Sequence, residues 1–343
     1  MAFVHLHVHS FYSLLDALSS PYALINKIKE YQMPGIALTD SGVMYGSVDF
    51  YQAANNYKLK PVIGAELYVS RHSHFDRSEE TKKPHQIVLI AYNNTGYQNL
   101  MVLVTKGQLE GLHEKPMIDW ELLNEFHEGI LALSGDYTGE LGETLLHKGI
   151  EAGVALAQKY EQLFGKDNYF IEIERHGLEE ENTLSPLLIE CSKRTGIPLV
   201  ATNNCHYASS SDRDAHDALI CVKNQKLISD QNRPMFKGDY SVLSEEKMRE
   251  LFADIPEACD ITVAISERCD IQIALGKNLL PPFQCPPGLS VPEYLLQLCT
   301  EGAEVRYGKP LQPSIIARLD YELGIINKTG FPSYFLIVWD FIH

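Results

Sequence analysis

The chain has 343 residues, of which 45% are hydrophobic and 22% are charged, and its formal net charge is −16. This composition is typical of a globular protein long enough for one large domain or two smaller ones, and the acidic balance argues against strong DNA binding by this chain alone. It lacks a run of 18 apolar residues and a secretion-signal layout at its start, so we expect a cytoplasmic protein without a membrane span.

Short apolar segments alternate with amphipathic segments along the first 275 residues. The expected strands are 3–9, 35–39, 61–69, 86–92, 129–134, 169–174 and 198–203. Between most of them we expect helices, at 21–31, 48–56, 97–109, 139–163 and 180–195. Repeated βα units with nearly continuous apolar strands predict a parallel sheet that is buried on both faces. Seven such strands favour a closed, TIM-like α/β barrel over an open sheet.

The character of the sequence changes after residue 275. A proline-rich connector is expected at 276–290, helices at 291–307 and 314–328, and an aromatic run at 331–343. The chain ends inside this run without a cap or a breaker, which we interpret as a cut within a longer protein. We therefore expect a barrel domain at 1–275, then the connector, then a truncated, mostly helical segment at 291–343.

Three histidines lie at alternate positions of the first expected strand. His5, His7 and His9 in the segment VHLHVHS share one face, because side chains alternate along a strand. Histidine is the commonest metal ligand, and imidazoles at this spacing can converge on one cation. A single histidine is more often structural, but three on one strand face favour a metal site.

Other ligand types lie near the expected strands, and barrel enzymes build their sites at the carboxyl ends of strands. Asp16 follows the first strand, Glu66 lies within the strand at 61–69, His85 comes just before the run 86–92, and His206 follows the strand at 198–203. Acids and imidazoles that come from separate strands and meet at one barrel mouth are typical of a multi-metal phosphoesterase site. His176, which follows the strand at 169–174, is a second-tier candidate near the same mouth.

Several segments of the chain follow one another in a familiar order: HLHVHSFYSLLDA, GIALTDSGVMYG, KPVIGAELYV, ALSGD and LVATNNCHY. In this order they resemble the PHP (polymerase and histidinol phosphatase) domain family. YNNTGYQNLMVLVTKG, ELFADIPEACDITVAISERC and GFPSYFLIVWDFI resemble the version of the domain that opens the bacterial DNA polymerase III alpha subunit. The resemblance covers nearly the whole chain. It implies a distorted seven-stranded PHP-type barrel at 1–275 and the beginning of the polymerase palm at 291–343.

The resemblance implies nine ligands in an intact metal site. The chain matches six of these positions, namely His7, His9, Asp16, Glu66, His85 and His206. It departs from the family at Ser41, where histidine is usual, at Asp136, where polymerase members often have cysteine, and at Asn204, where aspartate is usual. His5 precedes the matched pair and is expected to be a core residue or to support the ligands.

Two of these departures weaken metal binding. Ser41 is normally protonated, and Asn204 offers only a neutral carbonyl oxygen, whereas the Asp136 carboxylate can still bind a divalent ion. As the resemblance implies, the three departures affect different ions of a three-metal cluster. We therefore expect no useful hydrolase activity.

At most one divalent ion (zinc, manganese or magnesium) is expected to remain, bound near His7, His9 and Glu66. In the alternative without metal, the surviving imidazoles and acids satisfy one another through hydrogen bonds and ion pairs inside the barrel.

The resemblance implies that the full-length protein is a DNA-directed DNA polymerase that uses magnesium. It also implies contacts with the proofreading exonuclease subunit, the sliding clamp and primer-template DNA. The polymerase carboxylates of the family come after the segment YFLIVWDFI, so this chain is expected to lack polymerase activity. Two other readings remain: a free-standing metal-dependent PHP phosphoesterase, which leaves the residues after 281 unexplained, and a binding module that recruits an exonuclease.

Overall fold

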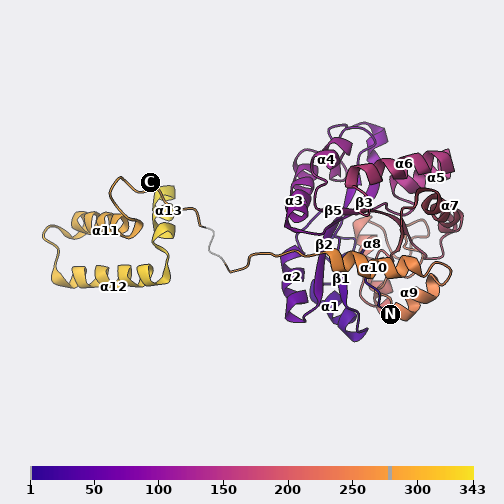
Figure 1. The fold of residues 1–343 in the computed structure, drawn as a ribbon. Coiled ribbons are helices and arrows are strands. Elements are labelled where there is room, and N and C mark those ends of the chain that lie inside the picture. The colour runs from indigo at the N-terminus through magenta and orange to yellow at the C-terminus, as the bar shows by residue number, and fades with distance from the viewer. Residues whose placement is uncertain (1, 277–279) are drawn as a thin grey trace. The chain divides into compact units, whose positions relative to one another are not determined.

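The chain forms two compact units, Met1–Ile273 and Ala274–His343, in a computed structural model that describes residues 2–276 and 280–343 (Figure 1). The predicted connector at 276–290 includes residues 277–279, which lie outside the described residues. None of the described helices combines the length and the apolar character that crossing a membrane requires.

A curled sheet surrounded by helices forms the first unit (Figure 1). Its strands follow the order β1 (Gly35–Leu38), β2 (Lys60–Val69), β3 (His85–Ala91), β5 (Ile130–Leu133), β6 (Tyr169–Ile173) and β7 (Leu199–Ala201). The two-residue strand β4 (Met117–Ile118), which was not predicted, pairs with β2.

The first expected strand, 3–9, is present as two isolated parallel bridges instead of a regular strand. His5 pairs with Ile36 in β1, and Val8 pairs with Cys205, which follows β7. This segment therefore lies between the first and the last strand of the sheet and completes a ring of seven segments. The predicted barrel-like α/β fold is confirmed.

The direction of β3 differs from the prediction. The pairs β1–β2, β5–β6 and β6–β7 are parallel, but β3 runs antiparallel to both β2 and β5, so the expectation of a wholly parallel sheet was wrong. Parallel neighbours need a long crossover, usually a helix. The connection from β2 to β3 is instead a loop with a 3-10 turn, η1 (Glu79–Lys82), and it returns the chain as an antiparallel neighbour.

Helices cover the outside of the sheet, and most lie where the sequence predicted them. They are α1 (Pro21–Glu30), α2 (Ser47–Asn56), α3 (Asn94–Leu109), α4 (Trp120–Glu125), α5 (Glu140–Lys148), α6 (Ile150–Phe164), α7 (Glu179–Thr195), α8 (Arg213–Lys223), α9 (Glu245–Leu251) and α10 (Glu257–Arg268). The start of α1 is set by Ser20, whose side chain accepts a hydrogen bond from the amide of Ala23. The single helix predicted at 139–163 is divided into α5 and α6 by Gly149, whose φ of 82° is incompatible with a continuous helix.

On β2 and β6, buried apolar side chains come first along the strand and buried carboxylates follow on the same face. Val62, Val88 and Phe170 belong to a buried cluster to which α10 contributes Ile265 and Cys269. Further along β2 and β6, on the same strand faces, the buried side chains are carboxylates rather than hydrocarbons. Glu66 and Glu172 therefore belong to strands whose earlier residues pack in an apolar cluster.

The second unit contains α11 (Val291–Tyr307), α12 (Pro313–Thr329) and α13 (Pro332–Ile342). The first two agree with the predicted helices, and the aromatic run forms the third. Leu295, Leu323 and Leu336 make its small core.

Candidate metal centre

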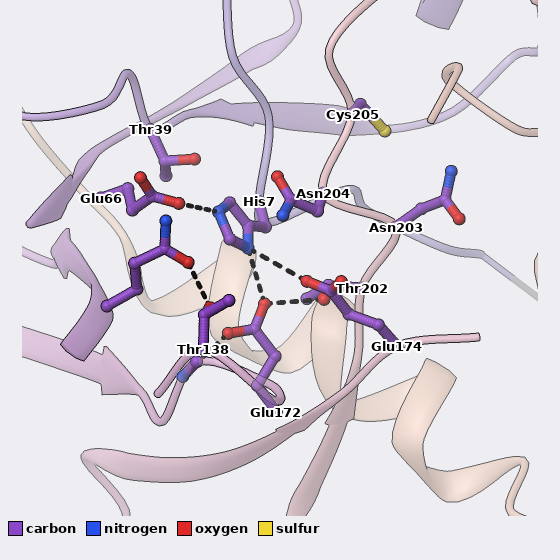
Figure 2. Close-up of polar contacts among 12 residues, drawn as sticks. His7, Thr39, Glu66, Thr138, Glu172, Glu174, Thr202, Asn203, Asn204 and Cys205 are labelled. Atoms are coloured by element: carbon purple, nitrogen blue, oxygen red, sulfur yellow. Dashed lines mark hydrogen bonds and ion pairs between the residues drawn. The ribbon is translucent and has the colours of Figure 1, made fainter. Parts of the chain in front are cut away.

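His7 lies between carboxylates that come from different strands (Figure 2). Its Nε2 is 3.2 Å from Glu66 Oε2, and its Nδ1 is 2.9 Å from Glu172 Oε1. A third acid, Glu174, is 3.6 Å from the same Nδ1. All of these side chains are almost fully buried. The closed ring thus brings the first residues of the chain against β2 and β6.

The electrostatics of this group favour a protonated His7. Burial opposes the charge on the imidazole, but the charge and hydrogen bond of Glu172, with help from Glu174 and Glu66, raise the pKa of His7 well above its usual value. Burial likewise opposes ionisation of Glu66, yet the hydrogen bond from His7 and the charges of His9 and His7 lower the pKa of Glu66 to about 2. In the absence of an ion, His7 therefore acts as the cation that balances these acids.

His9 contacts both of the neutral residues that depart from the family pattern. Its Nε2 is 3.0 Å from Asn204 Oδ1, and its Nδ1 is 3.2 Å from Ser41 Oγ. The ring of His206 stacks on it, with 4.5 Å between ring centroids. Burial lowers the pKa of His9 to about 4, so this imidazole is neutral and has a lone pair available to a hydrogen-bond donor or to a metal.

One set of family ligands is close enough to share an ion. The candidate ligand atoms of His7, His9 and Glu66 lie within 4.8 Å of one another. Two imidazoles and one carboxylate are a donor set that suits zinc or manganese. The residues present therefore fit a single divalent ion.

His206 contacts the backbone carbonyl group of Asp16 and not its carboxylate. The carbonyl oxygen of Asp16 accepts hydrogen bonds from His206 Nδ1 and His216 Nε2, at 2.9 and 2.8 Å. The carboxylate of Asp16 is 2.6 Å from the ammonium group of Lys223 in α8. The carboxylate of Asp16 is thus already paired with a lysine cation.

His85 and Asp136 have other contacts. His85, at the start of β3, is 3.2 Å from Glu143 in α5, and Glu143 is also paired with Arg71. Asp136 follows β5 and is buried, and its Oδ2 has no hydrogen-bond partner. Burial, followed by the charge of Glu174, raises the pKa of Asp136 well above its usual value.

The two second-tier histidines have separate hydrogen-bond partners. His5 Nε2 is 2.9 Å from the carbonyl oxygen of Leu243, to which it donates, and burial lowers the pKa of His5 to about 4. His176 Nδ1 is 2.9 Å from Glu181 Oε1 and 3.5 Å from Glu174. Burial opposes protonation of His176, but Glu181 and Glu174 raise its pKa.

The sequence prediction missed three residues that shape this centre: Glu172, Glu174 and Lys223. The two acids alternate with isoleucine in the segment Phe-Ile-Glu-Ile-Glu, which ends one residue after β6. A signal was therefore present, namely two carboxylates two residues apart in an otherwise apolar segment. Lys223 carries no such signal, because only the fold brings the end of α8 to Asp16.

A cavity of about 480 Å³ opens beside these residues. Asp16, Ser41, Glu66, Glu174, Asn204 and His206 contribute to its wall. Lys115, Lys223 and Lys237 also line it, so both signs of charge meet there. The centre is therefore reachable by a small polar molecule or ion.

The family of the chain follows from a match that covers the first residues of the ring and the strands from β1 to β6. Residues 5–176 match the family model of the PHP domain. The chain belongs to the PHP domain family. The part of this PHP protein at residues 293–343 matches a second model, described as the bacterial DNA polymerase III alpha NTPase domain. The resemblance predicted from the sequence motifs is confirmed.

Similar proteins named DNA polymerase III subunit alpha align with the whole PHP chain. The one from Treponema pallidum (strain Nichols) is 45% identical over 346 residues, covering 100% of this chain and 30% of the relative. The one from Escherichia coli (strain K12) is 37% identical over 352 residues, covering 99% of this chain and 30% of the relative. The chain thus spans 30% of the length of these relatives.

A solved two-domain protein of Bacteroides vulgatus, described as containing a predicted PHP-like metal-dependent phosphoesterase, is 12% identical. The match covers 78% of this chain and 70% of that one, with a TM-score of 0.40.

Proposed function

We propose that this chain is the PHP-containing part of a DNA polymerase III alpha subunit, and that the full-length protein carries out DNA-directed DNA synthesis with magnesium. Two family matches along one chain and the names of the aligned relatives support this proposal. In this proposal residues 1–275 are the PHP domain, 276–290 the connector and 291–343 the start of the polymerase palm.

Within that protein, the PHP domain serves as a structural platform, and its histidine-rich site holds at most one divalent ion. The observation that supports this best is the environment of His9, whose two nitrogens face the neutral side chains of Asn204 and Ser41. The ion pair between Lys223 and Asp16 supports it further, because an ammonium group cannot be a metal ligand. These contacts suit a network that is satisfied without a full metal cluster.

The partners follow from the same proposal. The platform contacts the proofreading exonuclease subunit, and the full-length protein acts with the sliding clamp on primer-template DNA in the cytoplasm. The net charge of −16 favours protein partners over DNA for this part of the molecule.

A free-standing PHP phosphoesterase is the second candidate. The group of His7, His9 and Glu66 beside an open cavity favours it, since one ion and one pocket can suffice for metal-assisted hydrolysis. The two candidates differ in what they predict for a simple assay.

The deciding experiment is hydrolysis of a chromogenic phosphomonoester by the purified chain with added manganese or zinc. We expect no turnover above that of the buffer, for the wild type and for His9→Ala alike. Turnover by the wild type that His9→Ala abolishes would overturn the platform proposal and establish the phosphoesterase. Retention of an exonuclease subunit by the immobilised chain tests the partner separately.

A further inference from the structure

Five aliphatic residues are exposed around the end of α8. They belong to the loop before α1, to the last turn of α8 and to the loop that follows it, and they are Leu14, Leu15, Val222, Leu227 and Ile228. Each of them is between 46% and 71% exposed. We refer to these five residues as the α8 rim. Single exposed aliphatic residues are common on proteins, but a group of them on adjoining segments is typical of an interaction site.

Direct contacts join the two segments of the α8 rim. The carboxylate of Asp16, which follows Leu15, is 2.6 Å from the ammonium group of Lys223, which follows Val222. After α8, the amide of Lys226 donates a hydrogen bond to a carbonyl oxygen of the last helical turn at 2.9 Å. The chain therefore turns back at the end of the helix, and the residues that follow this turn stay close to it.

Two residues of these segments have a left-handed backbone that side chains rarely adopt. The angle φ is 59° at Leu15 and 53° at Gln225. A bulky residue in this region is strained, and such strain is found mainly where the surrounding structure or the function of a site requires it. Because Leu15 is 46% exposed, burial of its side chain within this chain does not offset the strain. This favours a role for Leu15 in a contact outside the chain.

The charges beside the α8 rim are mainly positive, in contrast to the net charge of −16 of the whole chain. Residues 213–237 contain five basic and three acidic side chains. Two of the basic side chains are paired with Asp16 and Asp217, but within the described part of the chain no ion pair involves Lys226 or Lys237. Unpaired ammonium groups beside aliphatic side chains complement a partner that is both acidic and apolar.

We propose that the α8 rim binds a segment of another protein in which leucine-like side chains stand beside aspartate or glutamate. The aliphatic residues of the rim bury the apolar side chains of that segment, and Lys226 and Lys237 attract its acids. The site uses none of the candidate metal ligands, and it does not depend on which enzyme the full-length protein forms.

Two other kinds of partner fit the α8 rim less well. Proteins bind single-stranded nucleic acid through aromatic rings that stack on the bases, whereas the rim is aliphatic. An anionic membrane repels a chain whose net charge is −16.

Peptide selection on the folded chain tests the site. A library of random peptides displayed on phage is selected on the immobilised wild type, and binding of the enriched peptides is measured by fluorescence anisotropy. We expect these peptides to combine Asp or Glu with Leu, Ile or Phe, and to bind the double variant Leu227→Ser and Ile228→Ser about tenfold more weakly. Leu14→Ser and Lys226→Glu should also weaken binding. Leu109→Ser is the matched control, because it replaces a leucine of similar exposure in α3 and should leave binding unchanged.

Several outcomes would overturn the proposal. Peptides that lack acids, or that bind the wild type and the double variant equally while circular dichroism shows both to be folded, exclude the site, and so does a selection that enriches no peptide. The double variant is also compared with the wild type on phosphatidylglycerol vesicles and by sedimentation velocity. If the double variant loses vesicle binding or self-association that the wild type shows, the α8 rim binds a membrane or a second copy of the chain instead.

Discussion

Replacing His5 by glutamine tests whether the barrel interior holds the His5 imidazole in its neutral form. His5 is fully buried and donates a hydrogen bond to the carbonyl oxygen of Leu243, and burial lowers its pKa to about 4. In the unfolded chain the pKa of histidine is about 6.5. Between these two values the unfolded chain binds a proton that the native chain does not bind, so stability falls as the pH falls from about 6.5 to about 4.

The size of this effect follows from the two pKa values. They differ by about 2.5, and each pKa unit corresponds to about 1.4 kcal/mol, which gives about 3 kcal/mol in total. Of this, about 2 kcal/mol is lost between pH 7 and pH 5. Glutamine cannot titrate, but its amide can still donate to Leu243, so His5→Gln removes this part of the pH dependence and keeps the hydrogen bond.

Urea unfolding at pH 7 and pH 5 measures the difference. We expect His5→Gln to be less stable than the wild type at pH 7, because the contact with the Phe3 ring is lost, but to lose about 2 kcal/mol less on going to pH 5. His147→Gln, at an exposed position of α5, controls for the loss of a histidine. If the wild type and His5→Gln lose equal stability between the two pH values, then His5 is not held neutral in the native barrel and the reasoning fails.

Two further predictions concern the metal site and the sheet. The double variant Ser41→His and Asn204→Asp restores two ligand types beside His9, and we expect its affinity for Mn²⁺ to rise about tenfold or more, measured by calorimetry; an unchanged affinity would contradict the assignment of these positions. Gly64→Ala should destabilise the chain by about 3 kcal/mol or prevent folding, because a Cβ atom there would lie 2.4 Å from the carbonyl oxygen of Leu89 in the neighbouring strand. Gly324→Ala is the control, since its Cβ atom would meet open space and should not destabilise the chain. Thermal unfolding of both variants tests the difference.

The sequence predicted the histidine-rich part of the centre because strand alternation carries the information. His7 and His9 are two residues apart, and the fold brings Glu66 to both of them. Ser41 and Asn204, which were matched to the family through the order of its motifs, both contact His9. Strand alternation therefore grouped the two histidines, and the family resemblance pointed to Ser41 and Asn204; that these positions bind metal stays a prediction.

Contacts that depend on tertiary structure were beyond such reasoning. Lys223 reaches Asp16 across roughly two hundred residues of sequence, and no local pattern relates them. His85 was placed just before the run 86–92, in a strand that was expected to be parallel. Because β3 is antiparallel, its start lies beside the end of β2, where His85 is opposite Val69 and meets Glu143. The direction of a strand depends on whether the segment before it forms a crossover helix or a returning loop, and the sequence between β2 and β3 does not distinguish these two connections.

The way the ring closes has a consequence for synthesis of the protein. Residues 4–9 leave the ribosome before the strands they pair with, and the backbone at Cys205 that completes their pairing follows roughly two hundred residues later. Until then the ring of strands cannot close around His7 and His9. We therefore expect the enclosure of this histidine pair to come late in folding, because a nascent chain that stops before β7 lacks Asn204, whose carboxamide faces His9.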